Sequence, residues 1–476
     1  MKPVCFDKRN VAWPERLRIG VTACCVGLLA ACASPSPYQK PANPLPAHWG
    51  NGGGASADWS STPWKSLYTE APLQSLIEMA LARNTDVRQA VARIEEARAL
   101  WGLQRADQTP TVAVGASHTS ARTPPLVQGN NMALNVRRYD LGLNLLAYEL
   151  DVWGRVASLT EAARRQFEAT EEDRRTIRIT LVSDVAHAYY ALQEAQQRLR
   201  LLEQAQELRA QLHELTTRRL ALGAASELDV TLTQSALMGA RSEQAAMLRQ
   251  SEQARNALAL LIGGQWPQGW TAAPTLNNPR PDSTWGAGLS SDVLLNRPDV
   301  KAAELRLQAA HANIHAARMA FFPRLQLTGL VGTASPALNN LMGGGSQAWS
   351  LVPSLQLPIF DGGRAESGVD LAEARKNQWV INYERTLQLA FREVADLLAA
   401  RDTLGQQWVA QQAQLQALRE RLRLVDVRHR LGAANLSERL EAEREVLAVE
   451  QVLIQTQRQW LAANGQLFKA LGGGDV

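Results

Sequence analysis

A long internal repeat is the feature that most limits how this 476-residue chain can fold. Asp86 is followed 24 residues later by Pro110, and Asp299 is followed at the same interval by Pro323. Further on, three short sequences recur in the same order in both halves. They are Gly-Arg at 154–155 and 363–364, Leu-Gly-Ala-Ala at 222–225 and 431–434, and Gly-Gly at 263–264 and 472–473. Such self-similarity indicates a tandem duplication.

The repeat defines the expected division of the chain. We place the first copy at residues 73–264 and the second at 286–473, with a Pro- and Trp-containing linker over 265–285 and a short tail at 474–476. In both copies the pattern predicts helix, strand, loop, strand, long helix, turn and long helix.

The long helices follow from a lack of helix breakers. From Arg155 to Leu222 the chain has 68 residues without Gly or Pro, enough for about 100 Å of helix at ~1.5 Å per residue. Leucines recur at seven-residue intervals in each copy, which favours coiled-coil packing, although a plain antiparallel bundle explains these columns equally well. They are Leu201, Leu208, Leu215 and Leu222, and then Leu440 and Leu447.

Alternating segments decide between these two packings. Leu141, Leu143, Leu145 and Ala147 alternate with other residues, as do Leu351, Pro353, Leu355, Leu357 and Ile359, and "TVAVGASH" from Thr111 and "RLQLTGL" from Arg324 supply two more strands. Segments of about ten residues with one apolar face are typical of outer-membrane barrels. Four strands cannot close a barrel, and an open edge is not tolerated in lipid. The sequence therefore predicts a mainly α protein with membrane β-strands, whose barrel is shared between chains.

The N-terminus has the pattern of an export signal. Basic residues precede an apolar run from Ile19 to Ala31, which is too short to span a bilayer. We expect residues 1–31 to be removed as a lipoprotein signal peptide, because Leu29-Ala30-Ala31-Cys32 resembles a bacterial lipobox. Cys32 would then be lipidated, and Ala33 after it is consistent with delivery to the outer membrane. An ordinary signal peptide is the alternative.

Residues 32–72 are expected to form an extended, lipidated tether, since Pro, Gly and Ser are frequent there. Its aromatic residues are candidates to attach the tether to a surface. They are Tyr38, Trp49, Trp59 and Trp64.

Charge and motifs argue against several classes of function. The formal charge is +4, and the signal segment contributes most of it, so nothing favours nucleic-acid binding. All four cysteines lie at or before position 32, which excludes a disulfide within the mature chain. His311 and His315 have zinc-like spacing but lack the glutamate of a metalloprotease motif. We predict no catalytic residues, no metal and no cofactor, and hence no enzyme.

Together these features resemble a known family. The tandem plan, "RPDV" at 297–300, "FFPRLQLTG" at 321–329, the lipobox, and "DVWGR" and "FDGGR" ending at Arg155 and Arg364 are similar to the outer-membrane factor family. These are the TolC-like exit ducts of tripartite efflux systems, here in the NodT-type outer-membrane lipoprotein branch. The resemblance implies a homotrimer whose twelve strands form one barrel through the outer membrane, continued by a periplasmic α-helical coiled-coil barrel.

The resemblance also implies partners and sites. The partners would be a periplasmic adaptor, an inner-membrane pump of the resistance-nodulation-division type, and outer-membrane lipid. Helices reverse at Gly223 and Gly432, and in the family such tips close the duct and receive the adaptor. The positions matching that gate are Asp229, Arg430 and Glu441. Glu441 stands where relatives often carry Asp, and His429 where Tyr is common.

Two short segments mark where a membrane strand passes into a tunnel helix. Asp can cap the start of a helix, and glycine permits an unusual backbone turn. The residues assigned to these junctions are Asp151, Gly154 and Arg155 in the first copy, and Asp361, Gly363 and Arg364 in the second.

The predicted function is an exit duct that passes small molecules, such as drugs or toxic compounds, out of the cell. A duct for type I protein secretion uses the same fold and stays open as an alternative. A periplasmic coiled-coil scaffold lipoprotein is a weaker one, because it leaves the alternating strands unexplained.

If Cys32 carries a lipid, Cys32→Ser should abolish the incorporation of labelled palmitate. Loss of membrane association need not follow, since the barrel itself holds the protein in the membrane. Unchanged palmitate labelling of the variant would contradict the lipobox assignment.

Overall fold

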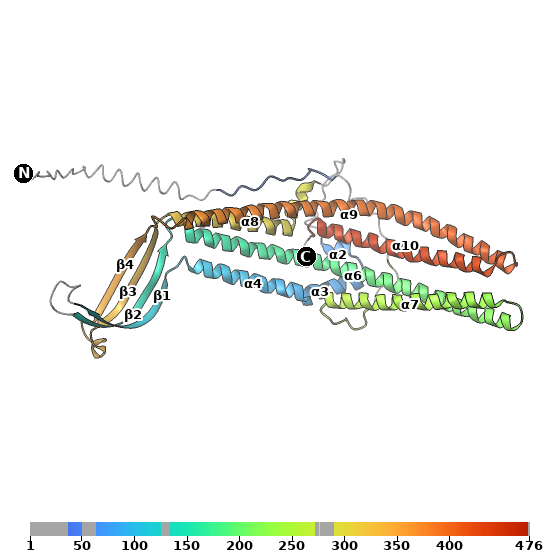
Figure 1. Ribbon diagram of the computed structural model, residues 1–476, viewed down its shortest axis with the longest axis horizontal. Coiled ribbons are helices and arrows are strands. Elements are labelled where there is room, and N and C mark those ends of the chain that lie inside the picture. The colour runs from blue at the N-terminus through green and yellow to red at the C-terminus, as the bar shows by residue number, and fades with distance from the viewer. Residues whose placement is uncertain (1–36, 50–62, 125–133, 272–275, 277–289, 475–476) are drawn as a thin grey trace, which may run out of the picture. The chain divides into compact units, whose positions relative to one another are not determined.

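The computed structural model describes residues 37–49, 63–124, 134–271, 276 and 290–474 (Figure 1). The predicted signal peptide, Cys32 and much of the linker lie outside these residues. None of the described helices has both the length and the apolar character needed to cross a bilayer.

The element order repeats as the sequence predicts. The first half contains α2 (Trp64–Leu67), α3 (Ala71–Arg83), α4 (Thr85–Ala106), β1 (Thr111–Thr123), β2 (Leu134–Leu150), α6 (Arg155–Ala221) and α7 (Glu227–Leu261). The second contains η2 (Ser291–Asn296), α8 (Pro298–Arg318), η3 (Met319–Phe321), β3 (Arg324–Ser335), η4 (Leu338–Asn340), β4 (Gln347–Gln356), α9 (Arg364–Arg430) and α10 (Leu436–Ala470). Helices α6 and α9 both have 67 residues, and α7 and α10 both have 35.

The chain forms two compact units that do not follow the two copies. One unit contains residues 1–42, 95–168 and 305–381, and therefore holds all four strands. The other contains residues 43–94, 169–304 and 382–476, and holds both helical hairpins. Each unit takes segments from both copies, and α6 and α9 contribute to both units.

The strands form one antiparallel sheet in the order β1-β2-β3-β4. Successive side chains in a strand point to opposite faces, so the register assigns each residue to a face. One face is apolar over most of its length. Its large members are Val112, Val114, Leu141, Leu143, Leu145, Leu325, Leu327, Val331, Trp349, Leu351 and Leu355.

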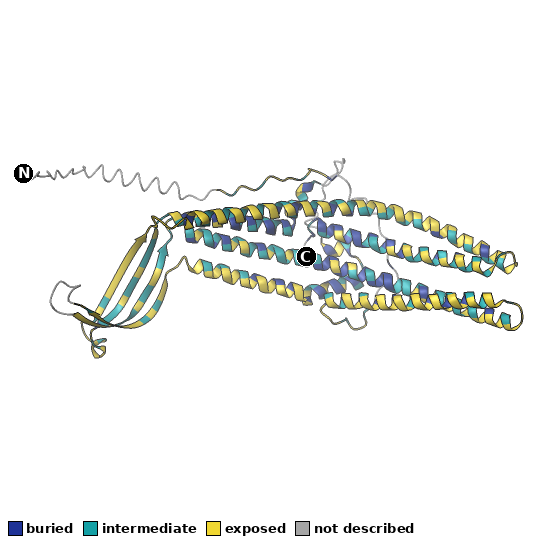
Figure 2. Cartoon of the chain, viewed as in Figure 1, coloured by how far each residue is buried: buried dark blue, intermediate teal, exposed yellow. Residues whose placement is uncertain are grey.

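The opposite face of the sheet carries mainly small and polar side chains, although Leu146, Leu330 and Val352 also lie on it. Its members include Thr111, Ser117, Asn144, Gln326, Thr328, Ser350 and Ser354. Of the described strand residues, only Ser335 is buried (Figure 2). A sheet with one apolar face, and both faces exposed, lacks the partners that would cover it within one chain.

A β-bulge interrupts the predicted alternation in β2. The register shifts between Leu145 and Tyr148, and Ala147 has a positive φ of 32°. The bulge returns Tyr148 to the apolar face, where it lies opposite Leu327. The predicted alternation was therefore wrong at Ala147. It was also too long in the last strand, because β4 ends at Gln356 and leaves Leu357 and Ile359 beyond it.

The second unit, which holds both helical hairpins and is called the hairpin unit below, is built around an apolar core. Leu73, Leu76 and Ile77 of α3 pack with Val182 and Tyr189 of α6, and the other buried members of the cluster include Val185, Leu258 and Phe468. Tyr189 satisfies its hydroxyl by donating to Glu70 at 2.8 Å. Apolar burial of this kind stabilises the unit, while the buried hydroxyl keeps a hydrogen-bond partner.

Trp49 and Trp64 of the predicted tether are both buried. Trp49 stacks on Phe391 with ring centroids 5.0 Å apart, and its indole nitrogen donates to the Phe391 carbonyl at 3.0 Å. These contacts attach the residues near position 49 to α9.

Equivalent residues of the two copies bind the ends of the two hairpins. Asn84, just before α4, donates from Nδ2 to the carbonyl of Leu261 at 3.0 Å. Arg297, just before α8, donates to the carbonyl of Ala470 at 2.6 Å. Leu261 and Ala470 are the last residues of α7 and α10. Both contacts satisfy carbonyls that a helix end leaves unpaired.

Arg297 makes further contacts that Asn84 cannot make. Its guanidinium pairs with Asp299 at 2.9 Å and Glu393 at 3.0 Å, and only 7% of its side chain is exposed. These carboxylates keep the pKa of Arg297 above its ordinary value despite burial. The arginine of the "RPDV" motif thus joins α8, α9 and α10.

We expect Arg297→Ala to destabilise the hairpin unit by about 2 kcal/mol, because it leaves the buried Ala470 carbonyl without its donor and removes the counter-charge of two partly exposed carboxylates. Arg318→Ala is the control. It removes a comparable pair, with Glu373 at 2.9 Å, whose side chains are both about half exposed, and should cost less than about 1 kcal/mol. The stability of each variant is measured in detergent as the midpoint of the thermal loss of its helical circular dichroism. Equal midpoints for the two variants would contradict the role of Arg297.

Candidate functional site

The first candidate site is the turn between α6 and α7. Gly223 has a φ of +72°, a conformation that favours glycine, and the Ala224 amide donates to the Arg219 carbonyl at 2.8 Å. Ser226 caps α7 by accepting from the Asp229 amide at 3.2 Å. The Asp229 carboxylate in turn accepts from the Ser226 amide at 3.0 Å and hydroxyl at 2.7 Å.

These bonds determine the state of the Asp229 carboxylate. The hydrogen bonds from Ser226 hold its pKa below the ordinary value, and the nearby charges of Arg219 and His429 contribute in the same direction. Asp229 is therefore ionised at neutral pH and holds the start of α7. In the single chain its Oδ2 atom accepts both of these bonds within the turn itself.

The second turn, between α9 and α10, is built in the same way. Gly432 has a φ of +75°, and the Ala433 amide donates to the Arg428 carbonyl at 2.8 Å. Asn435 caps α10, since its side chain accepts from the Glu438 amide at 2.8 Å. Both hairpins thus reverse by a left-handed glycine followed by a side-chain cap.

The three predicted gate residues do not pair with one another within one chain. Arg430 pairs with Asp426 on its own helix, and Glu441 pairs with Arg444 at 2.5 Å. Arg439 also reaches Asp426, at 3.2 Å. The partners Asp426 and Arg444 were not predicted from the sequence, although their spacing of four and three residues along a helix is a recognisable signal.

Glu441 lies in a pocket of about 480 Å³ within the hairpin unit. Arg209 of α6, Glu243 of α7 and Arg444 of α10 line its charged part. Its apolar lining includes Leu232, Leu440 and Leu447. A lining that combines apolar residues with charges of both signs suits an amphipathic helix more than a small ionic ligand.

The strand-to-helix junctions form a second pair of equivalent sites. Asp151 accepts from the amides of Val156 at 3.0 Å and Ala157 at 2.7 Å, so its carboxylate caps α6. Gly154 has a φ of +77°. Arg155 makes a two-bond pair with Glu149, at 2.8 and 2.7 Å, which ties the first turn of α6 to the end of β2.

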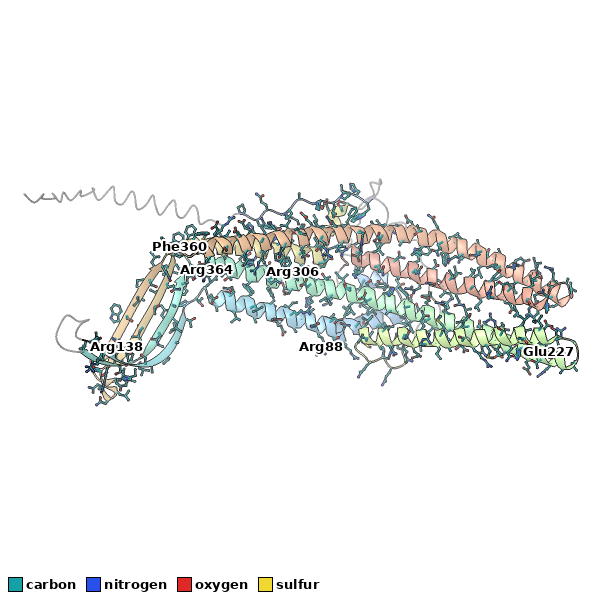
Figure 3. The ribbon with its side chains drawn as sticks, viewed as in Figure 1. Arg88, Arg138, Glu227, Arg306, Phe360 and Arg364 are labelled. Carbon is teal, nitrogen blue, oxygen red and sulfur yellow. The ribbon has the colours of Figure 1, made fainter. Side chains whose placement is uncertain are left out.

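The second junction uses Asp361 in the same role. Its carboxylate accepts from the amides of Gly363, Arg364 and Ala365 at 3.0, 3.2 and 2.8 Å, and these bonds lower its pKa. Gly363 has a φ of +83°. Figure 3 labels Phe360 and Arg364 at this junction. Within the described residues Arg364 has no partner equivalent to Glu149.

The two histidines with metal-like spacing make ordinary contacts. The Nδ1 atom of His315 lies 2.8 Å from the Ser158 hydroxyl, and the His311 ring meets the edge of Tyr38 with centroids 5.9 Å apart. Across the described ranges, no group of three or more His, Cys, Asp or Glu side chains is arranged to hold a metal ion.

Comparison with known proteins decides the family. The profile described as "Outer membrane efflux protein" matches residues 76–264 and 289–473. The chain belongs to the outer membrane efflux protein family. OprJ of Pseudomonas aeruginosa is 41% identical over 462 residues, which cover 96% of each chain. The cation efflux protein CusC of Escherichia coli is 37% identical over 94% of this chain and 98% of its own.

Solved structures agree with the family assignment. A membrane protein from Pseudomonas aeruginosa matches with a TM-score of 0.85 and 40% identity, over 92% of this chain and 97% of the other. The open MtrE outer membrane channel of Neisseria gonorrhoeae matches with a TM-score of 0.81 and 33% identity, over 92% and 98%. The predicted fold class is confirmed.

This outer membrane efflux protein is therefore an exit channel in the bacterial outer membrane, and it extends into the periplasm. The predicted function and localisation are confirmed at this level. The roles of the individual gate, junction and lipidation residues stay predictions.

Proposed function

We propose that three copies of this chain form one efflux duct, with a twelve-stranded barrel in the membrane and a helical barrel in the periplasm. The observation that carries the proposal is the four-stranded sheet with one apolar face and two open edges, β1 and β4. In lipid every backbone amide and carbonyl must be paired within the protein. Pairing β4 of one copy with β1 of the next meets this need and turns the apolar faces toward lipid.

The transported molecules in this proposal are small organic compounds. The described residues on the non-apolar face of the sheet, which would line the duct, are mostly neutral and small, such as Thr111, Asn144 and Ser354. A lining of this kind selects little, so selection would belong to an inner-membrane pump of the resistance-nodulation-division type. Relatives of this chain are named for toluene, antibiotic and cation efflux, and the duct itself performs no catalysis.

A periplasmic adaptor would join the pump to the helical hairpins. The pocket around Glu441, with Leu232 and Leu440 in its lining, has the mixed apolar and charged lining that a helical hairpin of an adaptor needs. Lipidation at Cys32 would add a second attachment to the outer membrane. A type I protein-secretion duct is the remaining alternative, and rescue of drug tolerance in an efflux-deficient strain, without rescue of protein secretion, would separate the two.

Native mass spectrometry of the purified protein in detergent tests the assembly, and three chains per particle are expected. A stable monomer would contradict the proposal, because two sheet edges would then stay unpaired in lipid.

The gate proposal places three copies of Asp229 and Glu441 around the axis at the periplasmic end, with Arg430 holding neighbouring turns together. Like charges at ~4 Å repel by about 4 kcal/mol at an effective dielectric near 20, whereas an exposed ion pair contributes at most about 1 kcal/mol. The Arg430 side chain is 76% exposed and can exchange Asp426 for a carboxylate of a neighbouring chain. A closed end of this kind is easily opened.

In planar bilayers, Arg430→Ala should conduct more, or more often, than the parent protein, because the closed end loses a pair. The double change Asp229→Ala with Glu441→Ala should lose cation preference. Glu214→Ala is the control, since this exposed acid pairs with Arg218 on its own helix. If both gate variants conduct like the control with unchanged selectivity, these residues do not form the constriction.

A further inference from the structure

The apolar face of the sheet ends in two arginines. On this face, Val114 and Leu143 are followed by His118 and Tyr139, whose rings stack with centroids 4.1 Å apart. Beyond them the next charged residues on the same face are Arg137, opposite Ser120, and Arg122, opposite Asn135. In this register the two arginines are diagonal neighbours on adjacent strands, about 7–8 Å apart at their Cα atoms.

The position of these arginines corresponds to a membrane boundary. From Tyr148 to Tyr139 the apolar face follows β2 over ten residues, that is nine residue steps, about 30 Å of strand at ~3.3 Å per step. At a tilt of ~40° this rises about 23 Å, close to the ~25 Å apolar band of an outer-membrane barrel. Arg137 lies one pleat beyond Tyr139, and Arg122 lies two pleats beyond His118. Both therefore reach the level of the lipid headgroups.

This boundary is the one on the cell surface. Strands β1 and β3 end, and β2 and β4 begin, at the end of the sheet opposite its junctions with the helices, and the helices extend into the periplasm. Figure 3 labels Arg138, the neighbour of Arg137, at that end. The outer leaflet of a bacterial outer membrane consists largely of a glycolipid whose sugar headgroup carries phosphates, so anionic groups surround the barrel at this height.

Both arginines are exposed, and neither has an ion-pair partner among the described residues. Arg138 differs in this respect. It points to the other face, where its Nε donates to Asp140 at 2.7 Å. The charge of Arg138 is therefore used within the chain, while those of Arg122 and Arg137 face outward at the membrane boundary.

We propose that Arg122 and Arg137 bind the phosphate groups of the outer-leaflet glycolipid, with His118 and Tyr139 against its sugar or acyl portion. Arginine is suited to this task, because its planar guanidinium pairs with phosphate through two parallel hydrogen bonds. Two adjacent arginines match a headgroup that carries two phosphates. The inference rests on the proposed three-chain barrel, which turns this face toward lipid.

The test measures lipid binding to the full-length protein by native mass spectrometry, using diphosphoryl lipid A and its phosphate-free derivative as probes. The parent protein should bind the phosphorylated form about tenfold more tightly or better, given the ~1 kcal/mol that each basic residue contributes near an anionic surface. The double change Arg122→Gln with Arg137→Gln should remove this preference. Arg138→Gln should keep it, although it removes the same charge from the neighbouring position.

Equal binding of the two lipid A forms by the parent protein would overturn the proposal, as would equal preference in the double variant and in Arg138→Gln. Equally tight binding of phosphatidylglycerol would overturn the assignment to a glycolipid. If the double variant fails to assemble, the preference of the parent protein for one of the two lipid A forms still tests the proposal. The double change Arg122→Lys with Arg137→Lys then keeps both positive charges and shows whether charge alone is sufficient for binding. The same spectra count the chains. Trimers without lipid preference refute only this inference, whereas an absence of trimers refutes the shared barrel.

Discussion

The unpaired backbone at the two edges of the sheet is the constraint on which the rest of this protein depends. β1 and β4 each expose a row of amides and carbonyls, and in a bilayer such groups have no water to bind. The chain has four strands, too few to close on themselves. The proposed trimer follows from this shortage of strands. Within one chain, each copy of the repeat supplies one pair of strands and one helical hairpin.

Duplication also explains how the hairpins are held. Asn84 and Arg297 occupy equivalent positions, and both bind the last carbonyl of a hairpin. The two side chains differ, but each donates to the equivalent carbonyl of its hairpin. Asn84 makes a neutral hydrogen bond, whereas the buried guanidinium of Arg297 adds ion pairs to the partly exposed Asp299 and Glu393. The second hairpin is thereby joined to α8 and α9 through charges that are costly to leave unpaired.

At the turns and junctions, carboxylates cap the starts of helices, close to the residues for which a function is proposed. Asp229 accepts two bonds from Ser226, and Asp151 and Asp361 each cap a helix of 67 residues. A carboxylate that caps a helix within one chain can still face the symmetry axis of the proposed three-chain assembly. Arg430 and Glu441 have partners three or four residues away on their own helices. Such exposed pairs exchange readily, which suits an end that must open.

Much of this protein could be predicted from its sequence, because the signals are local and repeated. The run without Gly or Pro from Arg155 sets the length of α6, and the duplication assigns the same length to α9. The glycines at 223 and 432 mark the turns, since only glycine adopts a positive φ without strain. The motifs that resemble the outer-membrane factor family also identified the class of function.

Only the tertiary structure decided which atoms meet. The bulge at Ala147 depends on how β2 pairs with β3, so the alternation along one strand could not reveal it. The role of Arg297 requires α8, α9 and α10 to come together from residues more than 90 apart in the chain. The opposite directions of Arg137 and Arg138 follow from their register. Local preferences determine which elements form, whereas long-range packing and strand pairing determine the neighbours of each side chain.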